Sequence, residues 1–229
     1  MKALPNEEGW RFERKFLLNP EIGKLWEARL KLHPAHYHQP FPPRQVNSLY
    51  FEGLDFRTTV AQRQGSTRRH KLRLRWYGPA KGLVAAPVLE VKQKRGDLGR
   101  KLRFPLSPIT MGPGVPSRRL FAILEKAGLP AEILEEARGL PLQSFNTYWR
   151  RYYALSGGSI RVTVDSELKV AWPRVGGGPP ARWAHVAGMV VELKYPDQLH
   201  DIGSQALQGL DLQLVQNSKF LSGIASWLE

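Results

Sequence analysis

Positively charged side chains alternate with apolar ones in the stretch HKLRLRWY (70–77), which places Lys71, Arg73 and Arg75 on one side of an extended chain. Three further stretches hold a glutamate two positions before a lysine, so both side chains share a face. The pairs are Glu13 with Lys15, Glu90 with Lys92, and Glu192 with Lys194. Arginine forms bidentate hydrogen bonds with phosphoryl oxygens, lysine supplies a compact charge, and glutamate ligates Mg²⁺ or Mn²⁺. These residue types indicate binding of a phosphate-rich anion with a divalent metal ion.

Period-two alternation predicts the strands that position these side chains. We expect strands at 9–18, 46–51, 70–77, 88–94, 100–106, 146–155, 160–165 and 190–195. Apolar residues at helical spacing predict helices at 19–33, 117–127, 131–138, 197–210 and 217–228. The stretch 33–44, with four Pro and three His, and the segment 78–86 are predicted to be loops, and 174–182 is expected to be flexible.

The charged faces of these strands are compatible with two architectures. In a sandwich, or in a sheet backed by helices, such faces are simply solvated. However, the faces hold few Ser, Thr, Asn or Gln residues, and they mix clustered cations with isolated glutamates. If the strands closed into a barrel, these side chains would line a cationic tunnel with a few carboxylates left for a metal ion. Such a tunnel would match a polyphosphate chain.

The overall charge also requires an anionic partner. The chain has 229 residues, with 34 Lys and Arg against 20 Asp and Glu, which gives a formal net charge of +14. Because there is no cysteine, thiolate nucleophiles, thiolate metal sites and disulfides are excluded. The N-terminal residues lack the apolar core of a signal peptide, and no stretch approaches about 18 apolar residues, so we expect a cytoplasmic protein without a membrane span.

Nucleic acid is an alternative partner for so basic a chain, because Trp and Tyr stand near Arg and could stack on bases. Proteins of this class interleave aromatic and basic side chains on one exposed face. Here Trp76 and Trp149 alternate out of phase with Arg75 and Arg150. The sequence therefore disfavours nucleic acid as the ligand.

Nine short strings, in order along the chain, resemble the VTC (vacuolar transporter chaperone) polyphosphate polymerase domain. This domain is part of the CYTH-like triphosphate tunnel metalloenzyme superfamily. The strings are ERKF (13–16), NSLYF (47–51), HKLRLRWYG (70–78), VLEVKQKRG (88–96), RKLRF (100–104), NTYWRRYY (146–153), IRVTVD (160–165), VVELKY (190–195) and NSKF (217–220). Each string alone is weak, whereas their shared order and spacing are specific.

The resemblance implies an α+β fold, mainly antiparallel β, in which a tunnel barrel of about eight strands is flanked by helices. It implies a flexible N-terminus at 1–9 and a single tunnel domain at 10–229, with a helical insertion near 117–138. The alternation of charged and apolar residues agrees with this expectation.

The resemblance also implies roles for individual residues. Phosphate-binding roles are implied for Lys15, Arg73, Arg75, Lys92, Lys101, Tyr148, Arg150, Arg161, Ser218 and Lys219, and the strand faces add Lys71 and Lys194. Of these, Arg73, Arg75, Lys92 and Arg161 are expected to be catalytic together with Glu192. Glu192 resembles the metal-binding glutamate, and Glu13 and Glu90 are further candidate ligands for Mn²⁺ or Mg²⁺.

Two departures from the family pattern affect the expected function. Arg11 replaces the first glutamate of the ExExK strand of the superfamily, and Gln216 replaces a lysine that the eukaryotic polymerases carry. The leading hypothesis is metal-dependent phosphoryl transfer from ATP to inorganic polyphosphate. The alternatives are hydrolysis of a triphosphate or of polyphosphate, and a non-catalytic sensor of polyphosphate or nucleotide that signals to a protein partner.

Overall fold

The structure is a computed structural model that describes residues 8–51, 69–95, 98–111, 117–155, 157–171, 183–199 and 210. In this part of the chain the main strands are β1 (Glu8–Leu18), β2 (Arg44–Phe51), β3 (Arg69–Tyr77), β5 (Val88–Arg95), β6 (Leu98–Pro105), β8 (Leu142–Ala154), β9 (Arg161–Ala171), β10 (Trp183–His185) and β11 (Met189–Pro196). Hydrogen bonds join them in the order β10-β9-β11-β1-β6-β5-β3-β2-β8, and β9 also pairs with β8. This additional pairing closes eight strands into an antiparallel barrel, which confirms the predicted fold class.

By their internal contacts the residues form two compact units, which we describe separately. The first unit contains Met1–Glu8, Val46–Thr147 and Val170–Trp183, and the second contains Gly9–Gln45, Tyr148–Lys169 and Ala184–Glu229. Among the described helices, none is long and apolar enough to cross a membrane.

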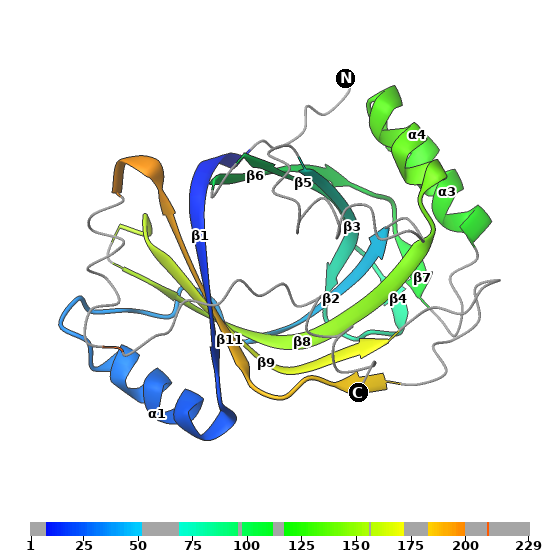
Figure 1. Cartoon of the computed structure of the whole chain (residues 1–229). Helices are drawn as coiled ribbons and strands as arrows, with labels where there is room; N and C mark the ends of the chain where they lie inside the picture. The colour runs from blue at the N-terminus through cyan, green and yellow to red at the C-terminus, as the bar shows by residue number, and fades with distance from the viewer. Residues whose placement is uncertain are drawn as a thin grey trace. The chain divides into compact units, whose positions relative to one another are not determined.

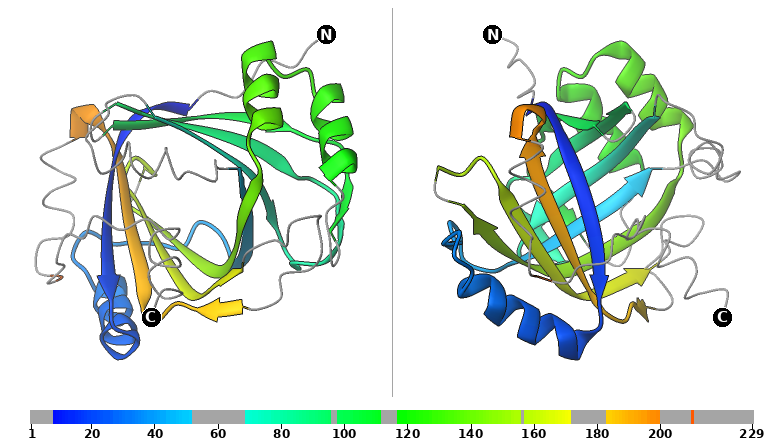
Figure 2. Two further views of the ribbon diagram at one scale, coloured as in Figure 1. Left: turned by 45° about the vertical axis from the view of Figure 1, so that its right-hand side comes forward. Right: turned by 60° about the vertical axis from the view of Figure 1, so that its left-hand side comes forward.

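The first unit buries the apolar side of β3, β5 and β6 under two helices, α3 (Ser117–Lys126) and α4 (Ala131–Gly139). Leu74 lies opposite Leu89 in the strand register, and Leu89 lies opposite Phe104, so apolar side chains form a continuous row across three strands. Leu120 and Leu124 of α3 are fully buried in the same core. Figure 2 shows the two helices side by side. The other side of these strands carries the charged residues.

The second unit is built on β1, β11 and β9, with α1 (Pro20–Lys31) packed on their apolar side (Figure 1). The side chain of Asn19 caps α1 by accepting a hydrogen bond from the backbone N–H of Glu21 at 3.0 Å. Trp26 and Leu30 then bury into a core that includes Phe16 of β1. Helix α1 therefore covers the apolar side of this sheet. It does not cover the charged side.

A polar network also holds α1 against β8. The carboxylate of Glu27 accepts hydrogen bonds from the hydroxyl of Tyr153 and from Nε of Arg151, the latter at 2.5 Å. Gln39 donates to the Tyr153 hydroxyl at 3.0 Å. Burial and the neighbouring Glu27 carboxylate raise the pKa of Tyr153, so its hydroxyl stays protonated and continues to donate.

Several element boundaries differ from those expected. The segment 78–86, predicted to be a loop, contains the short strand β4 (Gly82–Val84), which pairs with β7 (Ile109–Met111) in a separate two-stranded sheet. Three residues are too few to show alternation, and the pairing partner is distant in sequence, so no local pattern could reveal it. Strands β8 and β9 are longer than predicted, and β10 was not predicted. The helices predicted at 197–210 and 217–228 lie outside the described residues, apart from a single 3-10 turn at Asp197–Leu199 and residue 210.

We predict that Gly188→Ala destabilises the second unit by about 1–3 kcal/mol. Gly188 has φ +97°, and a Cβ there would lie 2.9 Å from the carbonyl oxygen of Leu18. Gly139→Ala is the matched control, because its φ is ordinary and a Cβ would meet nothing within 4 Å. Urea unfolding compares the two variants. Equal midpoints for both would contradict the strain assigned to Gly188.

Candidate functional site

Three lysines face one another across the charged side of the first unit. Lys71 on β3 lies directly opposite Lys92 on β5, and Lys92 lies directly opposite Lys101 on β6. Like charges at directly opposite positions destabilise a sheet. Lys101 is 8% exposed, so water reaches little of it. Three cations at neighbouring register positions are well suited to binding an anion.

The next row on the same strands is centred on the buried carboxylate of Glu90. Its Oε2 accepts hydrogen bonds from Nε of Arg73 at 2.8 Å and lies 2.6 Å from Nη2 of the same residue. Arg75 and Arg103 each place a guanidinium nitrogen 3.5 Å from this carboxylate. Tyr50 accepts a further hydrogen bond from Arg73 at 3.2 Å. One acidic group thus brings the guanidinium groups of three arginines together, and it hydrogen-bonds that of Arg73.

Glu90 is ionised in this environment. Burial opposes ionisation, but the charges of Arg73, Arg75 and Lys101 and the hydrogen bond from Arg73 hold the pKa of Glu90 well below its usual value of 4.5. In the sequences of β3, β5 and β6, Glu90 is the sole acidic residue and shares its face with Lys71, Lys92, Lys101, Arg73, Arg75 and Arg103. Among the side chains that the structure describes on this face, six cations therefore stand against one carboxylate, which leaves the face strongly positive. Glu90 as a metal ligand stays a prediction, and the contacts favour a role in positioning the arginines.

We predict that Glu90 makes stability depend on pH in the acid range. A carboxylate with a depressed pKa stabilises the fold above its unfolded pKa, and this contribution is lost as the pH falls through the folded pKa. Glu90→Gln is therefore expected to cost about 2 kcal/mol of unfolding free energy at pH 7. The difference from wild type should shrink progressively below about pH 4.5. Urea unfolding between pH 7 and pH 3 measures it, and a constant difference over that range would contradict the assignment.

In the second unit, Arg150 of β8 forms a buried ion pair with Asp165 of β9. Nε and Nη2 of Arg150 donate to the two carboxylate oxygens at 2.6 Å and 2.8 Å. Burial disfavours the cation, but Asp165 and then Glu192 hold the pKa of Arg150 well above its usual range. The guanidinium carbon also lies 5.4 Å from the ring centroid of Tyr148. This pair fixes the orientation of a permanently charged guanidinium.

Charges of opposite sign alternate between β1 and β11 in the same unit. Lys15 lies opposite Glu192, and Glu13 lies opposite Lys194. The ammonium group of Lys194 is 2.9 Å from Glu192 and 3.9 Å from Glu13, whereas that of Lys15 is 3.8 Å from Glu192. Glu192 is 5% exposed and also lies 3.6 Å from Arg150. Cations and carboxylates are therefore balanced here, in contrast to the first unit.

The carboxylates of the second unit fit a divalent ion that takes most of its ligands from phosphate. Within the described residues, no group of three or more His, Cys, Asp or Glu gathers into a metal cage. Mg²⁺ is commonly bound by one or two carboxylates together with phosphate oxygens, and such binding needs no cage. Glu192 is buried on a strand whose neighbour carries Glu13, and both belong to this donor class. Glu192 and Glu13 are thus suitable ligands for an ion that arrives with a phosphate chain.

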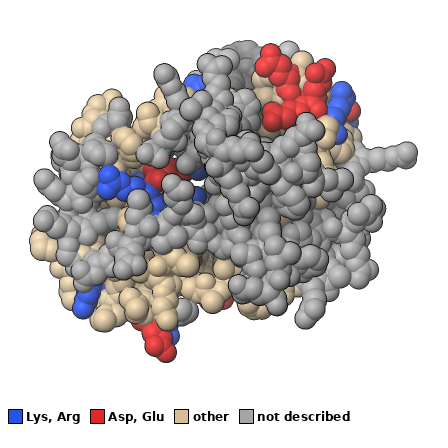
Figure 3. All heavy atoms as spheres, in the orientation of Figure 1, with Lys and Arg blue, Asp and Glu red and all other residues tan. Residues whose placement is uncertain are grey.

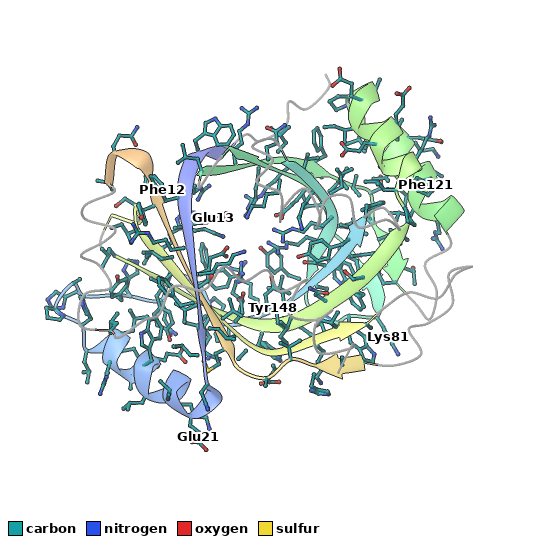
Figure 4. The ribbon with its side chains drawn as sticks, in the orientation of Figure 1. Phe12, Glu13, Glu21, Lys81, Phe121 and Tyr148 are labelled. Carbon is teal, nitrogen blue, oxygen red and sulfur yellow. The ribbon has the colours of Figure 1, made fainter. Side chains whose placement is uncertain are left out.

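The other predicted residues of the second unit differ in exposure. Tyr148 is buried on β8 (Figure 4), whereas Arg161 is exposed at the start of β9 and donates to the backbone carbonyl of Gly158 at 3.2 Å. Arg161 also lies opposite Lys194 in the register. Ser218 and Lys219 lie outside the described residues.

Two residues next to the predicted ones were missed. Thr163 lies opposite Glu192, is 7% exposed, and its hydroxyl has no hydrogen-bond partner among the described residues. Such a hydroxyl can bind a phosphoryl oxygen. Arg103 shares its face with Lys101, and the alternation in RKLRF was a sufficient signal to find it.

Acidic residues outnumber basic ones on α4, whose sequence holds Glu132, Glu135 and Glu136 against Arg138. Glu125, Glu132 and Glu135 are exposed on α3 and α4, and acidic side chains gather over α4 in Figure 3. Because the chain as a whole carries +14, the basic residues are concentrated elsewhere. This distribution differs from the evenly basic surface of a non-specific polyanion binder.

Three solved structures have the same fold as this chain at low sequence identity. A putative adenylyl cyclase from Hippeastrum, described as having a dominant triphosphatase activity, matches with a TM-score of 0.55 and 14% identity over 94% of this chain and 95% of its own. A protein from Pyrococcus horikoshii OT3 matches with a TM-score of 0.52 and 15% identity over 92% and 98%. A putative adenylate cyclase from Vibrio parahaemolyticus matches with a TM-score of 0.50 and 14% identity over 93% and 97%. At these identities the similarity establishes the fold.

The assignment of this chain to a family rests on its amino-acid sequence. No curated protein sequence matches this chain at a significant level. The family model described as the VTC domain, in contrast, matches residues 10–228, which is nearly the whole chain and includes both clusters of charged residues. This match confirms the family suggested by the nine strings. The chain belongs to the VTC domain family.

Proposed function

We propose that this chain transfers the γ-phosphoryl group of ATP to the end of an inorganic polyphosphate chain, with Mn²⁺ or Mg²⁺ as the metal ion. The observation that carries the proposal is the row of Lys71, Lys92 and Lys101, next to three arginines arranged around Glu90. A phosphate chain carries closely spaced negative charges, and such a row of cations can neutralise several of them at once. Membership of the VTC domain family supports the same ligand.

The reaction needs positioning and charge neutralisation more than a nucleophilic side chain. A terminal oxygen of polyphosphate attacks the γ-phosphorus of ATP, the bond to the β,γ-bridging oxygen breaks, and ADP leaves. Arg73 and Arg75 are held by Glu90 before any ligand arrives. Cations fixed in this way stabilise the charge of the transition state without reorganising during the reaction. In the second unit, the proposed phosphate ligands are Lys15, Lys194 and Arg150, whose guanidinium is held by Asp165.

A bound Mn²⁺ or Mg²⁺ would neutralise phosphoryl oxygens as a Lewis acid, with Glu192 and Glu13 as the proposed protein ligands. Glu192→Gln removes one negative charge and little volume. We expect it to raise the Mn²⁺ concentration that the reaction needs for half-maximal activity. Thr163 lies opposite Glu192 and is placed to donate to the same phosphate.

A second candidate function is hydrolysis of a triphosphate, in which water takes the place of the polyphosphate end as the nucleophile. It is favoured by the Hippeastrum protein of the same fold, which is described as having a dominant triphosphatase activity. In that reaction Glu13 would be a candidate base for the attacking water. Arg11 in the place of a superfamily glutamate favours transfer over hydrolysis, because it removes one acidic group from β1.

Incubation of the purified chain with ATP and Mn²⁺ separates these functions. Growth of polyphosphate, seen as internal phosphate signals by ³¹P NMR, is the expected result. Release of inorganic phosphate without chains would instead support the hydrolase. Binding of ATP and polyphosphate without turnover would overturn both and leave a sensor that acts through a protein partner. Glu192→Gln is the control for a contaminating enzyme.

A further inference from the structure

A cluster of two aromatic rings and one guanidinium lies in the second unit, outside the residues assigned above. The guanidinium carbon of Arg44 is 4.7 Å from the ring centroid of Phe41 and 5.5 Å from that of Tyr152. The two rings meet edge to face, with centroids 5.7 Å apart and an interplanar angle of 81°. Arg44 is therefore held at two aromatic rings, while Phe41 remains 50% exposed.

The segment that carries Phe41 is fixed against the end of β8. His38 and Ala154 exchange two backbone hydrogen bonds, of 3.0 Å and 2.9 Å. Gln39 donates to the hydroxyl of Tyr153 at 3.0 Å. Prolines on both sides of Phe41 restrict the backbone further. An exposed aromatic ring on a restrained segment loses little conformational freedom when it binds a flat ligand.

The cluster continues the side of β8 that carries the proposed phosphate contacts. Tyr148, Arg150 and Tyr152 alternate along this strand and therefore share a face. Tyr152 lies two residues beyond Arg150, which corresponds to about 7 Å along the strand. If the phosphates of a nucleotide bind at Arg150, the nucleoside part of that nucleotide is therefore within reach of Tyr152 and Phe41.

We propose that Phe41, Arg44 and Tyr152 form a nucleobase site, on which the base of a nucleoside triphosphate stacks while its phosphates bind Arg150. The inference rests on the proposed function, because the same triphosphate occupies both places. Aromatic rings and guanidinium planes stack on any base, so the site selects nucleotides over inorganic phosphate chains without choosing a particular base. The cluster thereby distinguishes ATP, the phosphoryl donor, from the polyphosphate acceptor, which has no base.

The test compares two ligands on one variant. Binding of the β,γ-imido analogue of ATP and of inorganic tripolyphosphate, each with Mn²⁺, is measured by calorimetry on wild type and on Phe41→Leu. We expect Phe41→Leu to weaken the ATP analogue about tenfold and to leave tripolyphosphate unchanged. Phe41→Tyr keeps the ring and should bind the analogue like wild type. Trp149→Leu is the matched control, because Trp149 is also exposed but lies on the opposite face of β8.

The outcomes distinguish this inference from the proposed function. Equal losses for both ligands in Phe41→Leu, or no loss for the ATP analogue, would overturn the nucleobase site while leaving the phosphate site in place. If wild type binds neither ligand, both proposals are wrong. If Phe41→Leu does not fold, an unchanged ratio of the two affinities in Arg44→Gln would overturn the inference, and a ratio shifted against the analogue would support it.

Discussion

Replacement of Asp165 by alanine is expected to lower the free energy of unfolding by about 3–5 kcal/mol, because it leaves a buried guanidinium without its bidentate partner. Arg150 is 7% exposed and Asp165 is 1% exposed, so water cannot replace the lost carboxylate. The cation cannot escape by losing its proton, since arginine stays charged in proteins. Urea unfolding followed by tryptophan fluorescence measures the change.

Two controls separate charge from packing in this experiment. Glu125 forms an exposed ion pair with Arg138 at 2.7 Å, and Glu125→Ala should change stability little, because exposed pairs contribute about 0–1 kcal/mol. The double variant Arg150→Met/Asp165→Leu replaces the pair by apolar side chains and should recover much of the lost stability. A loss in Asp165→Ala no larger than that in Glu125→Ala would contradict the structural role given to the pair.

The second large effect is expected from Lys92, the middle residue of the lysine row. Lys92→Gln should weaken tripolyphosphate binding about 10- to 100-fold, because it removes a charge-assisted contact. The same change should alter the free energy of unfolding by less than about 1 kcal/mol, because relief of the repulsion from Lys71 and Lys101 offsets the contacts that Lys92 loses. A large loss of binding with little change in stability is the signature of a site whose charges are arranged for a ligand.

Lys81→Gln is the matched control for this variant. Lys81 is exposed on the segment after β3 (Figure 4) and belongs to the same unit. It should change neither stability nor tripolyphosphate binding appreciably. If Lys92→Gln lowered stability much more than Lys81→Gln does, or bound tripolyphosphate as tightly as wild type does, the lysine row would have a structural function instead.

The sequence predicted which side chains share a face, because strand alternation is a local property. Arg73 and Arg75 were assigned to one side of their strand by spacing alone, and the structure places both at Glu90. Spacing also put Glu192 and Lys194 together, and their side chains lie 2.9 Å apart. The fold class followed from the same alternation together with the family resemblance.

Register between strands could not be predicted, because it depends on pairings between distant segments. Asp165, for example, pairs with Arg150 of another strand, and no local pattern links these two positions. The row formed by Lys71, Lys92 and Lys101 likewise requires the register of three strands. Strand β4 was missed because it is short and pairs with a segment that is distant in sequence.

The contacts that loop side chains make were harder still to predict. Residues 33–44 were expected to form a loop, and between α1 and β2 the structure has an irregular segment there with one isolated bridge at His38. Nothing in that stretch indicated that Phe41 and Arg44 would contact Tyr152. In an irregular segment, the direction in which a side chain points does not follow from its position in the sequence. The contact becomes visible only when the backbone pairing of His38 with Ala154 is known.

Calorimetric titration of inorganic tripolyphosphate, with Mn²⁺ present, into the wild-type chain tests the phosphate site most directly. We expect saturable binding that a single-stranded oligonucleotide of equal charge does not displace, and that Lys92→Gln weakens by at least about tenfold. Absence of tripolyphosphate binding would contradict the assignment of these strand faces to phosphate chains. The assignment would also be contradicted if the oligonucleotide displaced tripolyphosphate and Lys92→Gln bound tripolyphosphate with the affinity of wild type.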